Sequence, residues 1–193
     1  MKKICLILAL CLILSALTGC GASASKEPEE TYALIPVTPL EGDAETVDTT
    51  GMKEYTLKCG LTFFGPSGLK EKETEAMAGY MKSGYHIVMV IREDKAGTIL
   101  ENATAEEYAK LLSDSNGLTP FQYDTYGSLA TTYTAKSDEE GNEDFYYYVT
   151  VKESEDCFWL IQLVCPVSLS QDGGADKLAQ WSATFREAEQ KTE

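Results

Sequence analysis

The sequence predicts an α+β domain in which an antiparallel β-sheet is flanked by two main helices. Most of its apolar segments either alternate with a period of two or are rich in β-branched residues, as β-strands are. Neighbouring segments of this kind are joined by short turns containing Gly, Pro or Asn, which favours antiparallel pairing. Two further segments have helical spacing, and each helix needs a sheet face to cover its apolar side.

Three strands are predicted in the first half of the domain. Residues 55–63 alternate apolar and polar side chains, which is typical of one half-buried strand, and the turn residues 65–68 end it. Residues 69–75 are interpreted as a short edge strand, with a weak helix as the alternative. Residues 85–91 are almost continuously apolar and β-branched, so a central strand is predicted there.

The two helices are predicted at residues 102–113 and 175–188. In the first, Thr104 and Glu107 have the spacing of a capping box, in which each side chain satisfies a backbone N–H of the other residue. In the second, three large apolar residues recur at helical spacing: Leu178, Trp181 and Phe185.

The second half of the domain is predicted to contain a hairpin and a long apolar strand. Residues 129–136 and 145–152 form the hairpin, and residues 157–165 form the strand, which carries Trp159. The hairpin connection, residues 138–144, holds five acidic residues. Their spacing does not match a calcium-binding EF-hand loop, so a solvated hairpin tip is expected.

The first twenty residues have the features of a bacterial lipoprotein signal peptide. Lys2 and Lys3 precede 14 mainly apolar residues, which are too few to span a bilayer but suit the core of a signal peptide. The run ends in Leu17-Thr18-Gly19-Cys20, which resembles the lipobox of bacterial lipoproteins. The resemblance implies that residues 1–19 are removed and that the Cys20 thiol receives diacylglycerol. The protein is therefore expected at the extracytoplasmic face of the cell membrane, anchored in the lipid bilayer through Cys20.

Residues 20–52 are expected to be a disordered tether, and residues 53–193 the folded domain. The segment from residue 21 to residue 52 has seven acidic residues against Lys26 alone, with three prolines and no sustained apolar periodicity. Such a composition buries too little apolar surface to offset the entropy of ordering. As a random coil it would span roughly 30 Å.

Charge and histidine content exclude several classes of function. The chain has 16 Lys and Arg against 31 Asp and Glu, a net charge of -15, so binding to nucleic acid is not expected. One histidine, His86, cannot form a multi-histidine metal centre, and no serine or cysteine motif accompanies it. His86 is expected to be a surface or edge residue. No metal and no cofactor is predicted, and the protein is not expected to be an enzyme.

Three cysteines remain in the expected mature domain after Cys20: Cys59, Cys157 and Cys165. Cys157 and Cys165 are eight positions apart, so on one strand they would be separated by about 26 Å. A disulfide requires about 7 Å or less between its Cα atoms, which excludes this pair. Two alternatives remain: three buried free thiols, or one disulfide between Cys59 and one of the other two.

The domain pattern resembles the PsbP-like family, whose fold is shared by an extrinsic photosystem subunit and a yeast Ran-binding protein. The resemblance rests on the turn at residues 65–70, the helical segment at 105–109, the segment at 126–130, the Trp-bearing strand at 158–164, and Trp181 with Phe185. It implies a curved antiparallel sheet flanked by helices and a binding or accessory role. It identifies no catalytic residue, and members of one fold family can bind unrelated partners.

The predicted function is therefore that of a lipid-anchored, non-enzymatic module that binds another protein. Tyr146 and Tyr148, which share one face of a predicted strand, are the candidate contact surface, because Tyr is common at protein interfaces. A surface lipoprotein that binds a small ligand or a cation is the alternative, suggested by the acidic excess and the tyrosine-rich sheet.

Overall fold

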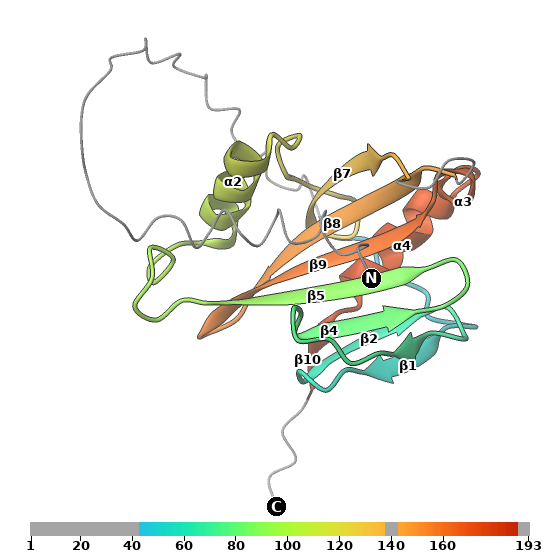
Figure 1. Cartoon of the computed structure of the whole chain (residues 1–193), viewed down its shortest axis with the longest axis horizontal. Coiled ribbons are helices and arrows are strands. Elements are labelled where there is room, and N and C mark those ends of the chain that lie inside the picture. The colour runs from blue at the N-terminus through green and yellow to red at the C-terminus, as the bar shows by residue number, and fades with distance from the viewer. Residues whose placement is uncertain (1–42, 138–142, 189–193) are drawn as a thin grey trace, which may run out of the picture.

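Two antiparallel sheets form the framework of the domain in a computed structural model that describes residues 43–137 and 143–188 (Figure 1). The larger sheet has seven strands in the order β3-β4-β5-β9-β8-β7-β6, and the smaller has three in the order β1-β2-β10. The strands of the larger sheet are β3 (Lys70–Glu71), β4 (Gly79–Lys82), β5 (Ile87–Asp94), β6 (Gln122–Tyr123), β7 (Leu129–Ala135), β8 (Phe145–Glu153) and β9 (Cys157–Pro166). The predicted α+β class is confirmed, whereas the smaller sheet was not expected as a separate unit.

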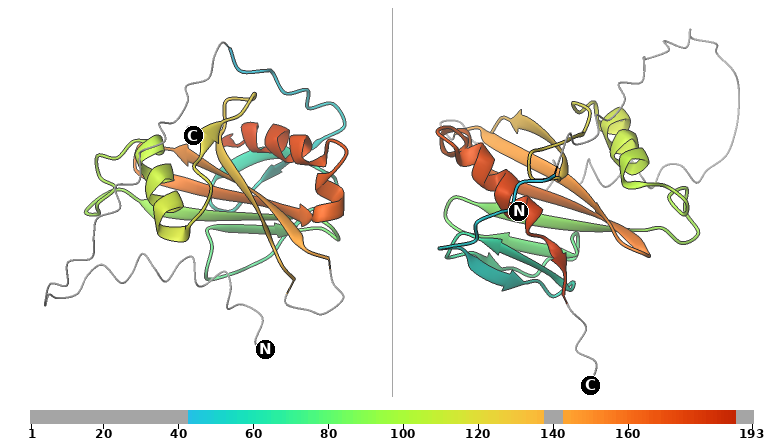
Figure 2. Two further views of the ribbon diagram at one scale, coloured as in Figure 1. Left: turned by 90° about the horizontal axis from the view of Figure 1, so that it is seen from above. Right: turned by 180° about the vertical axis from the view of Figure 1, so that it is seen from behind.

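Helices lie on both sides of the larger sheet. The helices of the described residues are α2 (Ala105–Asn116), α3 (Val167–Ser170) and α4 (Gly174–Ala183). Figure 2 shows α2 on one side of the larger sheet and α4 on the other, the side that also holds the smaller sheet. None of the described helices is long and apolar enough to cross a membrane.

The larger sheet therefore separates two apolar cores. The core on the α2 side contains Tyr108, Leu112, Phe121, Leu129, Val149, Val151, Phe158 and Leu160. The core on the α4 side includes Leu61, Phe63, Val88, Trp159, Ile161, Leu163, Leu178 and Phe185. Successive residues of a strand point to opposite faces, and here both faces are covered, so β9 is buried from Cys157 to Cys165. This explains why its sequence is apolar on both faces, with Gln162 as the polar exception, rather than alternating.

The segment predicted as one strand at residues 55–63 is a hairpin, so that prediction is wrong. It consists of β1 (Lys53–Thr56) and β2 (Leu61–Gly65), which pair with each other. Leu57 donates its N–H to the carbonyl of Leu61 at 2.8 Å and accepts one from Gly60 at 3.0 Å. Gly60 has φ +89°, a conformation that glycine adopts without strain. The apolar alternation continues through the turn because Leu57 is also buried, so the pattern conceals the reversal.

The first helix matches its prediction closely. Thr104 and Glu107 form the predicted capping box, in which the Thr104 hydroxyl accepts the Glu107 N–H and the Glu107 carboxylate accepts the Thr104 N–H. The helix ends at Gly117, which has φ +62°. Of the short predicted strands, the edge strand is confirmed as β3, and the central strand as β5.

The last helix is shorter than the predicted residues 175–188, because α4 ends at Ala183 and the chain joins the smaller sheet. The Phe64 N–H donates to the Thr184 hydroxyl at 2.9 Å, and β10 (Arg186–Glu187) then pairs with β2. Phe185 is therefore outside the helix, although it is buried and its ring stacks on Phe63 with centroids 4.3 Å apart. The helical spacing in the sequence does not reveal that the end of this segment pairs with β2 as a strand instead of continuing the helix.

Candidate functional site

An open groove of about 670 Å³ lies beside the loop that joins β3 to β4. Its lining comprises Lys58, Glu71, Lys72, Glu73, Thr74, Glu75, Met77, Ala78, Gly79 and Tyr80. Small-molecule sites usually enclose about 300–1,000 Å³, so the groove is large enough for a ligand or a short peptide segment. Carboxylates and ammonium groups share it with the apolar side chains of Met77 and Ala78.

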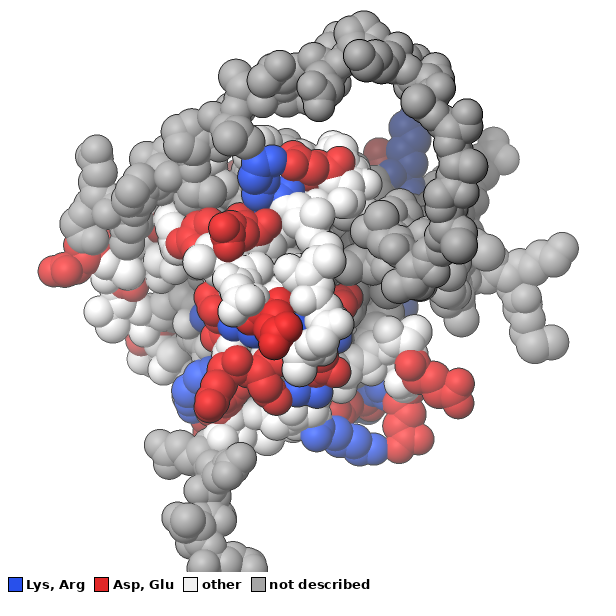
Figure 3. Space-filling view, turned by 90° about the vertical axis from the view of Figure 1, so that its left-hand side faces the viewer, with Lys and Arg blue, Asp and Glu red and all other residues white. Residues whose placement is uncertain are grey.

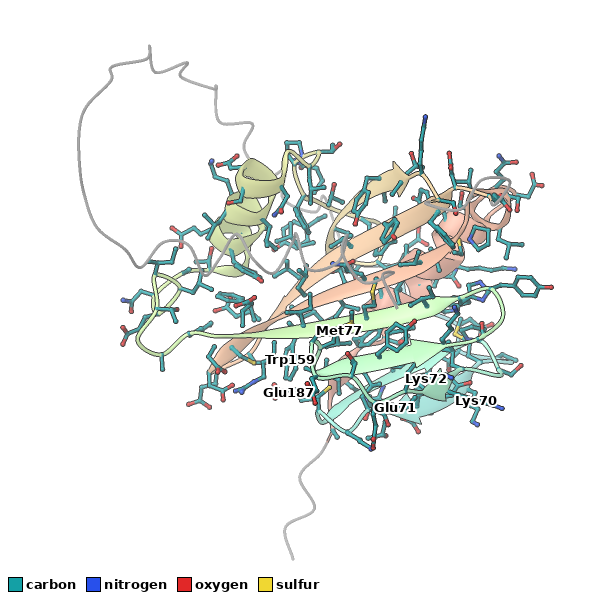
Figure 4. The ribbon with its side chains drawn as sticks, in the orientation of Figure 1. Lys70, Glu71, Lys72, Met77, Trp159 and Glu187 are labelled. Atoms are coloured by element: carbon teal, nitrogen blue, oxygen red, sulfur yellow. The ribbon has the colours of Figure 1, made fainter. Side chains whose placement is uncertain are left out.

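The walls of the groove are held together by one lysine from the β1–β2 turn. The Lys58 ammonium pairs with Glu73 at 2.7 Å, and the Lys58 N–H donates to the Glu71 carboxylate at 3.0 Å. On the other side, the Lys72 N–H donates to the Tyr80 carbonyl at 2.8 Å, which continues the β3–β4 ladder into the loop. Figure 4 shows Lys70, Glu71 and Lys72 following one another along this edge of the sheet.

Lys58 and Glu73 hold each other in their charged forms. The hydrogen bond and charge of Lys58 lower the pKa of Glu73, and Glu73 in turn raises the pKa of Lys58. Burial raises the pKa of the neighbouring Cys59 thiol and that of Tyr80. Because the nucleophilic form of cysteine is the thiolate, a raised pKa keeps Cys59 in its unreactive form. The groove is therefore equipped to bind by charge and apolar contact.

The sequence contained only a weak signal for this groove. Glu71, Glu73 and Glu75 alternate with polar residues, which was interpreted as part of an edge strand. The partner that gives them structure, Lys58, is in another hairpin. A contact between residues 13 to 15 positions apart in the chain has no local periodicity that could reveal it.

Tyr146 and Tyr148 do not form the exposed contact surface that the sequence predicted. Tyr148 is only 4 % exposed, and its hydroxyl donates a hydrogen bond to Asp124. Burial and then this carboxylate raise the pKa of Tyr148 strongly. Tyr146 is half-buried against the same core. Packing of α4 against β8 withdraws Tyr148 from any contact surface, whereas Tyr146 keeps a partly exposed side chain.

Asp124 organises the turn before β7 and explains why Tyr148 is held there. Its second carboxylate oxygen accepts the N–H groups of Tyr126 at 2.9 Å and Ser128 at 2.8 Å. The Ser182 hydroxyl of α4 lies 3.4 Å from the Ser128 hydroxyl. These contacts satisfy buried polar groups between the sheet and α4, so we interpret them as structural.

His86 is more enclosed than the predicted surface or edge residue. It is half-buried in the β4–β5 turn, where its ring meets the Trp181 ring edge-on with centroids 5.1 Å apart. Burial, and then the positive charge of Lys177, lower the pKa of His86. The side chain thus contributes to packing against α4 and is not part of the groove lining.

The three cysteines of the described domain are all free thiols. Cys157 and Cys165 are buried, and Cys59 is half-buried. The first of the two alternatives left by the sequence is therefore the one observed, except that Cys59 is partly accessible. Within residues 43–137 and 143–188, no three His, Cys, Asp or Glu side chains are grouped so as to hold a metal ion.

Some predicted features lie outside the described residues. They include the signal peptide, the lipidation residue Cys20 and most of the acidic hairpin tip, residues 138–142. The final part of the expected tether is described: residues 43–52 form no helix or strand, and the Glu45 N–H donates to the Thr125 carbonyl at 2.9 Å.

Fold and groove together define a small α+β domain with an open, charged groove. No protein-family model matches the sequence, and no curated protein matches it significantly. Among solved structures, a protein from Bacteroides thetaiotaomicron VPI-5482 is similar at 15 % identity and a TM-score of 0.49. That match covers 74 % of this chain and 50 % of the other, so this chain spans about half the length of that protein.

Two further similar structures have the fold that the sequence pattern resembles. The cyanobacterial PsbP (CyanoP) of Synechocystis sp. PCC 6803 is 12 % identical with a TM-score of 0.42, covering 76 % of this chain and 98 % of that protein. A point mutant of the protein Mog1 is 13 % identical with a TM-score of 0.43, covering 71 % of this chain and 96 % of that protein. The structures similar to this chain thus include PsbP-like and Mog1 folds, and at this level of similarity they assign no function.

Proposed function

We propose that this protein is a lipid-anchored cell-envelope protein whose folded domain binds another protein and does not catalyse a reaction. The observation that carries the anchoring is the Leu17-Thr18-Gly19-Cys20 sequence directly after a 14-residue apolar run. The charged groove at the β3–β4 loop supports the binding role, because its residues offer ionic and apolar contacts.

Anchoring through Cys20 has a sufficient physical basis. Each acyl methylene buried in the bilayer contributes about 0.8 kcal/mol, and two chains hold a protein stably where one does so marginally. A diacylglycerol on the Cys20 thiol supplies two chains. The acidic chain, with a net charge of -15, gains nothing from contact with anionic headgroups, so the domain is expected to stand off the surface.

Replacement of the lipidated cysteine tests the anchoring. Cys20→Ala should leave unprocessed, unlipidated precursor and reduce the share of protein in the detergent phase of a Triton X-114 partition. Cys59→Ala is the matched control, because it removes a cysteine of the folded domain and should leave processing and partitioning unchanged. Normal processing and unchanged partitioning of Cys20→Ala would contradict the lipoprotein proposal.

A surface lipoprotein that binds a small ligand or a cation is the second candidate. The volume of the groove and the carboxylates of Glu71, Glu73 and Glu75 favour it. A compound that binds the native state raises the melting temperature. A melting screen of the full chain against small organic cations and divalent metals distinguishes the two. A shift that Glu73→Gln and Glu75→Gln together abolish would support the small-ligand function.

A further inference from the structure

Three lysines line up on one face at the edge of the seven-stranded sheet. Lys70 of β3 lies directly opposite Lys82 of β4, and Lys72 follows where the ladder continues opposite Tyr80. Residues two apart on a strand, and residues paired across strands, share a face, so the three side chains point the same way. All three are exposed.

This arrangement is unfavourable unless an anion is nearby, because like charges directly opposite each other on a sheet are destabilising. Among the described residues, none of the three lysines forms an ion pair. Of the nearby carboxylates, Glu73 pairs with the Lys58 ammonium. Glu71 accepts the Lys58 N–H, and its place between Lys70 and Lys72 on the strand puts it on the opposite face. Among the described residues, Glu75 is the one carboxylate of this loop without a bound partner. One carboxylate does not offset three lysines, although the whole chain carries 31 acidic residues.

An apolar row continues from the lysines across the sheet. The strand register places Ile87 opposite Lys82, then Val164, Tyr147 and Tyr133 in line. Val164 is fully buried, and the two tyrosines pack against the α2-side core, where their rings stack with centroids 4.6 Å apart. Ile87, next to the lysines, is partly exposed. The helix on this side, α2, packs against β7 and β8 and makes at most marginal contact with β3, β4 or β5. Figure 1 shows α2 to the upper left of these strands.

We propose that this face of β3, β4 and β5 is the docking surface for an acidic, partly apolar segment of a partner protein. The inference rests on the proposed protein-binding function and extends its site from the groove, which Lys72 and Tyr80 also line, onto the sheet. Carboxylates of the segment pair with Lys70, Lys72 and Lys82, and its apolar side chains pack against the partly exposed Ile87 and Tyr80.

Charge distribution selects a protein segment over an anionic membrane. A negatively charged membrane interacts with the whole molecule, whose net charge is -15. On the end of the molecule at the left of Figure 1, acidic side chains outnumber basic ones (Figure 3). A short acidic segment meets only charges within about one Debye length, roughly 8 Å at physiological salt. At that range the segment meets the three exposed lysines that share this face.

Edge lysines also have a protective role in many proteins, where they prevent strands from pairing with other chains. Side chains of either charge can serve that protective role, and no ligand is needed for it. Reversal of the lysines to glutamate would preserve protection but abolish attraction for carboxylates, so charge reversal separates the two explanations.

The test uses the full chain in detergent micelles and a panel of fluorescein-labelled ten-residue peptides that alternate Glu with Val, Ile or Leu. Identical peptides with Lys in place of Glu are the charge control. We expect fluorescence anisotropy to detect binding of Glu peptides only, weakened at 300 mM relative to 50 mM NaCl. The combined variant Lys70→Glu, Lys72→Glu and Lys82→Glu should bind at least tenfold more weakly.

The matched control variant combines Lys53→Glu, Lys110→Glu and Lys177→Glu, which changes the net charge equally at other exposed sites. It should bind within about threefold of the unmodified chain. Equal loss in both variants, or no binding of any Glu peptide, would overturn the proposal. Lysine-dependent binding to phosphatidylglycerol vesicles without peptide binding would also overturn it, in favour of a membrane contact. Each of these failures leaves the Cys20 anchoring test unaffected, so the two proposals can fail separately.

Discussion

At the scale of single residues, the corner between α3 and α4 depends on a glycine. A Cβ atom on Gly174 would lie 1.7 Å from the Leu169 carbonyl oxygen, a backbone atom that cannot move aside without displacing α3. The two preceding residues have positive φ, +51° for Asp172 and +86° for Gly173. The chain reverses here with no room for a side chain at the first position of α4.

Replacement of this glycine should destabilise the domain. Gly174→Ala forces the backbone of α3 and α4 apart, and we expect a loss of about 1–3 kcal/mol, the usual cost of overpacking. Gly84→Ala is the matched control, because a Cβ there meets nothing within 4 Å. Urea unfolding of the full chain measures both, and equal stability of the two variants would contradict the close approach at Gly174.

His86 should make stability depend on pH in a defined window. Burial and Lys177 lower its pKa in the folded state, while the unfolded value is about 6.5. The unfolded chain therefore binds the proton more readily. The contribution of neutral His86 to stability is fully present above about pH 6.5 and is lost as the pH falls through the lower folded pKa. His86 is the one histidine of the chain, so no other imidazole contributes.

The measurement is the urea midpoint at pH 7.5, 6.5 and 5.5. We expect the unmodified chain to lose stability over this range and His86→Gln to lose less. If the two chains have parallel pH profiles, His86 is not the group that titrates.

At the scale of elements, a glutamate of the sheet, Glu153, bonds to the N-terminus of α2. Glu153 of β8 accepts the Ala105 N–H at 3.1 Å with one oxygen and pairs with Lys95 at 2.6 Å through the other. Lys95 is 8 % exposed and lies over the Phe158 ring, 4.5 Å from its centre. A carboxylate at a helix N-terminus is also stabilised by the helix dipole.

Removal of this charge should loosen α2. Glu153→Gln leaves the shielded Lys95 ammonium without its carboxylate, and we expect a loss of about 1–3 kcal/mol, as for hydrogen bonds to charged groups. Lys110→Gln is the control, because it breaks an exposed pair with Asp114 within α2 and should cost about 0.5 kcal/mol or less. Similar urea midpoints for the two variants would show that the Glu153 contacts do not stabilise α2.

The elements also show where periodicity is informative. The capping box of α2 and the strands β5, β7, β8 and β9 were predicted within a few residues, because their signals are local. The β1–β2 reversal was missed, since Leu57 is buried in the turn, and so was the early end of α4. For α4, the contact of Thr184 with the distant strand β2 decided the outcome.

At the scale of the whole molecule, the sheet with two cores organises the chain, and residues 43–52 lie against it. The Glu45 N–H bonds to Thr125, and Met52 packs against the α4-side core. Limited proteolysis of the full chain should therefore remove residues before about Asp43 and spare a core that extends to about Arg186, because hydrogen-bonded and packed backbone is cut slowly.

Intact-mass analysis of the digest locates both ends of the resistant core. A core that begins after Met52 would show that residues 43–52 detach readily from the domain. A chain that resists digestion from Gly21 onward would contradict the interpretation of residues 21–42 as an exposed tether.

The sequence by itself determined the α+β class, the presence of most long elements and the lipobox as a hypothesis. These depend on hydrophobic period, capping residues and composition, which are properties of short stretches of chain. It also excluded a Cys157–Cys165 disulfide through strand geometry alone, and the two cysteines are indeed free.

Only the tertiary structure decided which strand faces are covered. Tyr148 and Ile87 both belong to strands with strong apolar patterns, yet Tyr148 is buried beneath α4 and Ile87 stays partly exposed on a strand that α2 does not cover. The alignment of Lys70 with Lys82 and the bond between Lys58 and Glu73 likewise exist only once hairpins are registered against one another. The proposed binding surfaces depend on contacts between elements, and the free energy of those contacts does not follow from the hydrophobic period of any short segment.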